Sequence, residues 1–234
     1  MPRDSAKTTT RFEGFADSDA RFFHTLAKHQ DRGWFQAHKR EYEEGWVAPM
    51  NALLAEVREK IRPFFGRYDL GEPKVFRIYR DVRFSKDKSP YKTHIGGYIP
   101  LKRTGAGPGL PAPLYVQFGT ESLVGAGHYM MDPKQLDRYR NAVLDGRRGK
   151  ELVAILARLK KAGFTVESHE MLKNVPRGMN PDHPRADLLK RKALTAAFPK
   201  LPKQLIVSRK LIDWLVQETR HVAPLVEWLA AATE

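Results

Sequence analysis

The amino-acid sequence predicts an α+β fold in which a central antiparallel sheet is flanked by N-terminal and C-terminal helices. Three observations predict it. Apolar residues recur at helical spacing between Phe22 and Ile61, alternate with polar residues in short runs between Phe76 and Met131, and return to helical spacing from Asp132 onward. Because only turns separate the short runs, antiparallel pairing is favoured over parallel crossovers. We expect a flexible tail over residues 1–10 and a single α+β domain over residues 11–234.

The N-terminal region is expected to form two or three helices. Asp17 and Ser18 predict a cap for a first helix, which Gly33 closes. A long amphipathic helix follows, and Pro49 predicts either a kink in it or the start of a second helix. Its core-facing positions share spacings of three, four or seven residues and are Phe35, Tyr42, Trp46, Met50, Leu53, Val57 and Ile61.

The middle of the chain reads as four strands. Residues 76–84 predict the first, because Phe76 and Ile78 alternate with charged neighbours, although Arg80 departs from the pattern. The other three are expected over residues 93–101, 114–119 and 123–131. The Gly and Pro content of residues 103–113 predicts a loop.

The last third is expected to be mainly helical. Asp132 and Pro133 predict a helix that stops at Gly146, and a second helix ends at Gly163. Residues 164–166 predict a short strand. Further helices are expected after Pro184 and after Ser208, with Pro224 starting or kinking the terminal segment.

The charge is unevenly distributed. The chain carries 41 basic and 27 acidic side chains, a formal charge of +14. Residues 11–62 hold nine of each sign, whereas residues 74–103 hold nine basic residues against Asp81 and Asp87, a net charge of +7. Such a basic segment raises the local concentration of anions.

Several functional classes are excluded by composition. Cysteine is absent, which removes disulfides, thiolate nucleophiles, zinc fingers and iron–sulfur clusters and favours a cytoplasmic location. No run is apolar enough for a membrane helix or a signal core, so we expect no membrane partner. The sequence has no His-Glu-x-x-His motif, nucleophile elbow or Walker loop, and we expect no metal and no cofactor.

The basic segment supplies the candidate site. In an extended segment Arg77, Tyr79, Asp81 and Arg83 project to the same side. Asp81 then either orients an Arg77 or Arg83 guanidinium for a ligand or forms an ordinary surface salt bridge. The hydroxyls, backbone amides and lysines of the turn over residues 85–92 can converge on an oxyanion. The predicted ligand-binding residues are Arg77, Tyr79, Arg80, Arg83, Ser85, Lys88, Tyr91 and Lys92.

Any proton transfer is assigned to Asp81 and His94, because an imidazole near a carboxylate can act as a general acid or base. Whether a reaction is catalysed is left open. The main hypothesis is binding of a phosphate-bearing or other anionic small molecule. One alternative is sequence-tolerant nucleic-acid binding, with Tyr79, Phe84 or Tyr91 stacking on bases. Another is docking of an acidic protein partner, and the plainest reading is a solvated basic hairpin.

The chain also resembles an uncharacterised bacterial family, domain of unknown function 2461. The residues that carry the resemblance are Arg32-Gly-Trp-Phe35 with Lys39 and Tyr42, the run from Phe76 to His94, Gly125-Ala-Gly127, and Asp182-His-Pro184 leading to Leu188-Leu-Lys190. The resemblance implies an α+β domain. It implies no particular reaction, cofactor or partner.

Overall fold

The computed structural model describes residues 11–102 and 109–234. The expected tail over residues 1–10 and most of the expected Gly- and Pro-rich loop lie outside the described residues.

The N-terminal helices form one long rod and a shorter partner. The shorter helix is α1 (Arg21–Lys28); the rod joins α2 (Arg32–Tyr42), the π-helical turn η1 (Glu43–Val47) and α3 (Ala48–Ile61), and the 3-10 turn η2 (Arg62–Phe64) follows it. Asp31 caps α2 by accepting a hydrogen bond from the Trp34 backbone N–H at 2.8 Å. The wide turn η1 ends two residues before Pro49, which lacks an N–H and would clash with the carbonyl four residues earlier in a regular α-helix. The helix therefore passes Pro49 without ending.

Within the described residues, six strands form one antiparallel sheet in the order β1-β2-β3-β4-β6-β5. The strands are β1 (Lys74–Val75), β2 (His94–Ile99), β3 (Ala112–Gly119), β4 (Leu123–His128), β5 (Thr165–Glu167) and β6 (Leu194–Ala197). The predicted α+β class with a central antiparallel sheet is confirmed. Strand β6 is an addition that the sequence pattern did not predict.

The C-terminal part contributes the remaining helices: α4 (Pro133–Leu144), α5 (Gly146–Lys161), α6 (Ala186–Lys190), α7 (Lys203–Ile206) and α8 (Lys210–Thr233). The start of α4 is a capping box, in which Asp132 and Gln135 each accept a backbone hydrogen bond from the other. Gly146 opens α5 as well as following α4, and the Asp145 carboxylate caps the new helix. Helix α8 continues through Pro224.

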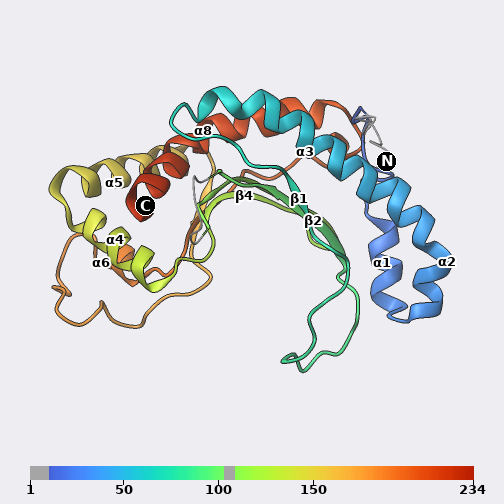
Figure 1. The fold of residues 1–234 in the computed structure, drawn as a ribbon, viewed down its shortest axis with the longest axis horizontal. Helices are drawn as coiled ribbons and strands as arrows, with labels where there is room; N and C mark the ends of the chain where they lie inside the picture. Colours follow the sequence, from blue (N-terminus) through green and yellow to red (C-terminus); the bar gives the residue numbers. More distant parts are fainter. Residues whose placement is uncertain (1–10, 103–108) are drawn as a thin grey trace, which may run out of the picture.

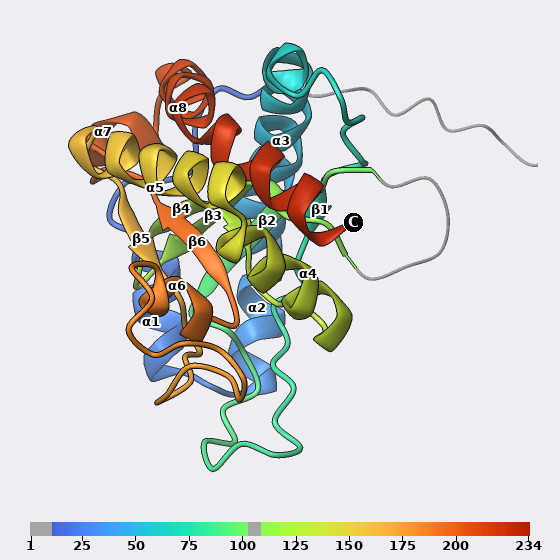
Figure 2. The ribbon, with the colours of Figure 1, turned by 90° about the vertical axis from the view of Figure 1, so that its left-hand side faces the viewer.

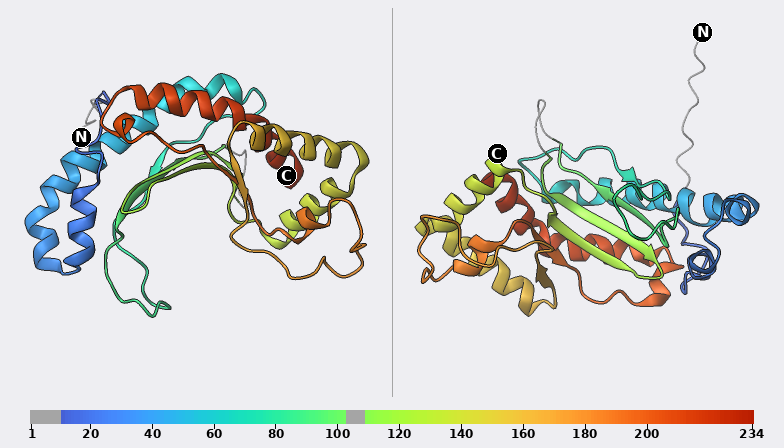
Figure 3. Two further views of the ribbon diagram at one scale, coloured as in Figure 1. Left: turned by 180° about the vertical axis from the view of Figure 1, so that it is seen from behind. Right: turned by 90° about the horizontal axis from the view of Figure 1, so that it is seen from below.

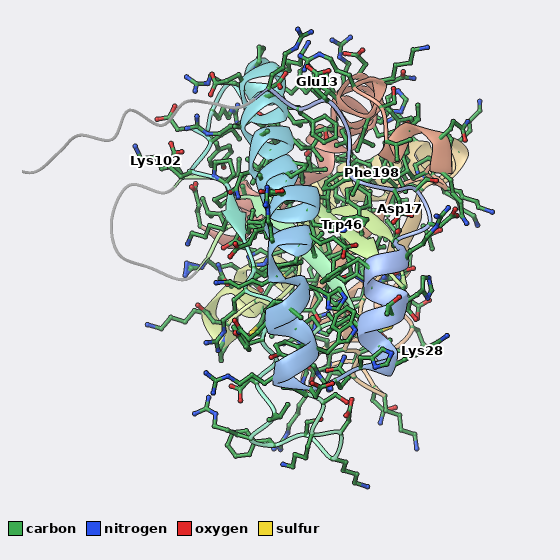
Figure 4. The ribbon with its side chains drawn as sticks, turned by 90° about the vertical axis from the view of Figure 1, so that its right-hand side faces the viewer. Glu13, Asp17, Lys28, Trp46, Lys102 and Phe198 are labelled. Carbon is green, nitrogen blue, oxygen red and sulfur yellow. The ribbon has the colours of Figure 1, made fainter. Side chains whose placement is uncertain are left out.

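The sheet is curved, and its two faces differ. Helices α3 and α8 lie over the convex face, while no described helix covers the concave face (Figures 1 and 3). Helices α1 and α2 stand at one end of the arch and α4 to α6 at the other. Buried apolar side chains form one contiguous cluster from Phe12 to Ala232. Trp46, labelled in Figure 4, lies in this cluster between α1 and the rod and contacts Phe23 at a ring-centroid distance of 4.8 Å.

The prediction of a strand over residues 76–84 is wrong. Regular pairing ends at Val75, and beyond it only an isolated bridge joins Tyr79 to Tyr91. The Phe76 N–H still bonds to the Gly96 carbonyl, but the next pair is Lys92 N–H to Ile78, so the register shifts by two residues. Thr93 instead pairs with Thr120 after β3. Of the alternating apolar residues only Ile78 is buried, whereas Phe84 is 96% exposed.

Residues 76–93 therefore form an irregular hairpin, here called the basic hairpin. It extends from the sheet on the side away from α3 and α8 (Figure 2). None of the described helices combines the length and the apolar character needed to cross a bilayer.

Candidate functional site

The base of the basic hairpin is fixed against α1 and α2. Backbone bonds join Arg80 to Pro90 at 2.9 Å and Lys92 to Ile78 at 2.8 Å. The Tyr91 N–H donates to Gln30 Oε1 at 3.0 Å. The Tyr91 ring is buried and stacks on Phe35 at 4.5 Å, and the Tyr79 ring packs against both. These aromatic contacts hold the hairpin in place.

At the tip of the hairpin, Arg83 and Lys88 donate hydrogen bonds to other residues of the hairpin. Arg83 donates two hydrogen bonds to the Asp81 carboxylate, at 3.0 and 2.7 Å, and these lower the pKa of Asp81. Lys88 donates to the Val82 carbonyl at 2.9 Å, and the Ser85 N–H donates to the same carbonyl at 3.3 Å. Hydrogen bonds among its own residues therefore hold the tip together.

Arg80 is also neutralised within the hairpin. Its guanidinium donates to the Asp87 carboxylate and, at 3.2 Å, to the Ser89 carbonyl. The Ser89 hydroxyl donates to the other Asp87 oxygen at 2.6 Å. Hydrogen bonds from Ser89 and then from Arg80 lower the pKa of Asp87 to about 2. Asp87 is therefore a carboxylate throughout the physiological range.

Lys92 and Arg77 differ from Arg80 and Arg83, whose guanidinium groups are paired with carboxylates. The Lys92 ammonium donates to the Arg77 carbonyl at 3.0 Å and lies 5.3 Å from the centre of the Phe76 ring. Within residues 11–102 and 109–234, neither Lys92 nor Arg77 has a carboxylate oxygen within 4.0 Å. Burial, followed by the charge of Arg77, lowers the pKa of Lys92. Two uncompensated positive charges therefore lie together at the hairpin base.

His94 begins β2 on the concave face of the sheet. Its partner across the ladder is Gly119, where an added Cβ would lie 2.5 Å from the His94 Cβ, so glycine is required there. Burial, followed by the charge of Lys92, lowers the pKa of His94, and Glu121 opposes this. The imidazole is accordingly neutral at pH 7 and gains its proton below its ordinary pKa of 6.5.

An open hollow of about 320 Å³ lies between the basic hairpin and α1. Lys92, His94, Arg80 and Ser89 line it, together with Asp87, Ala27, Gln30, Tyr91 and Thr93. Of the two residues assigned to proton transfer, His94 lines this hollow and Asp81 does not. Among the described residues, no group of three or more His, Asp or Glu side chains is placed to hold a metal ion.

The concave face next to this hollow carries aromatic residues that the sequence analysis did not assign to a site. Phe76 is 42% exposed and stacks on Tyr98 at 5.4 Å, and Tyr115 lies opposite Tyr98 in the ladder. The Tyr115 hydroxyl donates to Gln117 at 2.7 Å. Strand parity already places Tyr98 on the same side as His94, but the contact with Phe76 depends on the pairing of β1 with β2.

Comparison with protein families decides the affiliation of the chain. Residues 19–228 match the family model described as conserved hypothetical protein, DUF2461. The chain belongs to the DUF2461 family. The match spans the basic hairpin, the hollow and the whole sheet, so the resemblance expected from the sequence is confirmed. A search of curated proteins finds no match to this DUF2461 chain.

Proposed function

We propose that this DUF2461 protein binds a phosphate-bearing or other oxyanionic small molecule in the hollow between the basic hairpin and α1. The observation that supports the proposal most is the state of Lys92. Lys92 lines the hollow and is partly desolvated, and its ammonium contacts the Arg77 carbonyl and lies near the Arg77 charge instead of a carboxylate. An oxyanion would relieve the repulsion between Lys92 and Arg77.

The ligand contacts are assigned as follows. Lys92 supplies positive charge and His94 a ring N–H donor, whereas Arg77 does not line the hollow and adds positive potential only as a neighbour of Lys92. Arg80 contributes less, because Asp87 already occupies its guanidinium. Hydrogen bonds to a charged group are worth about 1.5–3 kcal/mol each, so three of them support binding in the micromolar range after entropic losses. A chain without cysteine suits a reducing compartment, and we propose a cytoplasmic location for this activity.

Calorimetric titration with pyrophosphate and with sulfate tests the proposal. We expect saturable binding by the wild-type protein and at least a tenfold weaker affinity for Lys92→Ala, because one charge-assisted contact is lost. Arg83→Ala is the matched control, since it removes a basic residue of the same hairpin whose charge is already paired with Asp81. We expect it to change the affinity less than twofold.

Thermal unfolding of each variant excludes a folding defect as the cause. Absence of binding by the wild-type protein to both anions, or equal losses in Lys92→Ala and Arg83→Ala, would overturn the proposal.

A further inference from the structure

The concave face of the sheet forms a continuous surface that starts at the hollow. Strand alternation places His94, Gly96 and Tyr98 of β2 on it, with Tyr115 and Gln117 beside them on β3. The neighbouring positions on β4 and β6 are small: Gly125, Gly127, Thr195 and Ala197. The right-hand view of Figure 3 looks onto this face, and no described helix lies over it. The glycines of this floor are buried, so its partly exposed surface comes from the side chains Tyr98, Tyr115, Gln117, Thr195 and Ala197.

Aromatic rings stand at both sides of this floor. The Phe76–Tyr98–Tyr115 cluster lies next to Lys92 on the side of the basic hairpin. On the other side Tyr129, which follows β4, stacks on His169 at 4.0 Å with an interplanar angle of 13°. Tyr129 is 64% exposed, so a large part of its ring faces solvent. The distance from β1 to β4 is three inter-strand spacings, about 14 Å.

Positive charge borders the same surface. Lys74 pairs with Tyr98 across the ladder and so shares its side of the sheet, and Lys92 and Arg77 follow in the basic hairpin. None of the three forms an ion pair within the described part of the chain. Carboxylates also occur here: Asp87 lines the hollow, Glu121 acts on His94, and Glu167 lies on the far strand β5. Cations therefore gather where the aromatic cluster begins.

We infer that the anion of the proposed function is the phosphodiester of a single-stranded nucleic acid, which crosses the concave face from the hollow toward Tyr129. The inference rests on the proposed function, because Lys92 and Arg77 are the cations that bind the phosphodiester backbone of the nucleic acid. The bases lie on the exposed rings of the aromatic cluster and of Tyr129. Cations that follow the backbone, combined with rings for base stacking, are the features of sequence-tolerant single-strand binding.

A single strand fits this surface better than the other polyanions. Duplex DNA is read by an element that enters a groove, whereas this face is hollowed and flanked by helices on both sides (Figure 1). Docking of an acidic protein would use the cations but gives no reason for the exposed rings beside them. Unpaired bases supply both the charge and the planar apolar surface.

Fluorescence anisotropy with two labelled 15-mers tests the inference. One is oligo(dT) and the other is an abasic phosphodiester of the same length, which carries the charge without the bases. We expect the wild-type protein to bind oligo(dT) at least tenfold more tightly. With three cations engaged, the logarithm of the affinity should fall with the logarithm of salt concentration with a slope near −2, at about 0.7 per phosphate contact.

Paired substitutions separate stacking from charge. Tyr129→Ala should weaken oligo(dT) binding roughly 5- to 100-fold and leave abasic binding unchanged, while Tyr129→Phe retains the wild-type affinity because the ring is kept. Lys92→Ala should weaken binding of both polymers and reduce the salt slope by about 0.7. Lys150→Ala, an exposed lysine on α5, is the control and should change neither.

The outcomes distinguish this inference from the proposed function. Equal affinities for oligo(dT) and the abasic polymer, or equal effects of Tyr129→Ala and Tyr129→Phe, overturn the nucleic-acid inference. If pyrophosphate still binds in a Lys92-dependent manner, the proposed function stands and the ligand is a small molecule. If neither polymer nor pyrophosphate binds, both are overturned. Binding of duplex DNA as tightly as oligo(dT) also contradicts the inference.

Discussion

The two faces of the sheet are built from the same strands but have different surroundings. Along β2, Ile95 and Ile99 point to the convex side and are buried beneath α3, while His94 and Tyr98 point to the concave side and stay partly exposed. In β4 the alternation is lost, because every residue from Val124 to His128 is buried and only Leu123 is exposed. The difference shows that, along one strand, alternate residues either pack into the core and stabilise the fold or remain available to a ligand. Substitutions on the two faces should therefore have separable effects.

The largest effect is expected on the convex face. Ile99 is fully buried, and Ile99→Ala removes apolar contacts and leaves a cavity. We expect a loss of about 3 kcal/mol in the free energy of unfolding, measured by urea denaturation. Pyrophosphate binding by the folded fraction should be unchanged. A similar loss from His94→Ala on the opposite face would show that the two faces are not separable.

An effect of similar size is expected from the pH dependence of stability through His128. Burial lowers the pKa of His128 to about 4, although the charge of Asp132 acts in the opposite direction, and the His128 Nε2 has no hydrogen-bond partner among the described residues. The unfolded chain, with an ordinary pKa of 6.5, binds the proton first. The contribution of His128 to the free energy of unfolding is therefore fully present above pH 6.5, and about 3 kcal/mol of it is lost as the pH drops to 4.

His128→Gln should remove this component. Urea unfolding of the wild-type and variant proteins from pH 4 to 7.5 measures it as a difference between two curves, which cancels the contribution of the carboxylates. Parallel curves would contradict the assignment.

On the concave face, His94 should make ligand affinity depend on pH. Its pKa is lowered by burial and by Lys92, so the ring is neutral at pH 7 and becomes a cation as the pH falls. Because the charge of sulfate is constant over this range, its affinity should increase severalfold between pH 7.5 and 5.5. Calorimetric titration of His94→Gln should show a flat profile, and a profile equal to the wild type would exclude His94 from the site.

The smallest effect is expected for the Tyr115 hydroxyl. Tyr115→Phe keeps the ring in the aromatic cluster and removes the bond to Gln117. We expect a loss of about 0.5–1.5 kcal/mol in unfolding free energy and no change in pyrophosphate affinity. A tenfold change in that affinity would place the hydroxyl among the ligand contacts.

Much of the fold could be predicted from local patterns. Asp132 predicted the capped start of α4, and the apolar spacing from Phe35 to Ile61 predicted a long helix packed against the core. Strand β6 was missed because Leu-Thr-Ala-Ala is short, and two of its four residues are alanines, which are depleted in strands. The strand expected over residues 76–84 failed for another reason. Its alternation is genuine, but Thr93 pairs with the segment after β3, so the ladder loses register at the hairpin.

The candidate site could be predicted only in part. Composition located the cations, and strand parity placed Lys92 and His94 on one side. Which cations keep a free charge could not be predicted, because the Arg80–Asp87 contact depends on how the turn closes around Ser89. The contact of Phe76 with Tyr98 likewise depends on the long-range pairing of β1 with β2.

The contact between Asp87 and Arg80 gives the hollow an internal competitor. Any visiting anion that seeks this guanidinium must first displace a carboxylate that remains ionised down to a pH of about 2, whereas at Lys92 it displaces only a neutral carbonyl. Anionic ligands are therefore directed to the Lys92 side of the hollow. A ligand with a single negative group can bind at Lys92 alone. A ligand with two such groups spaced across the opening would also displace Asp87 from Arg80, and its binding would therefore open the turn and move the hairpin.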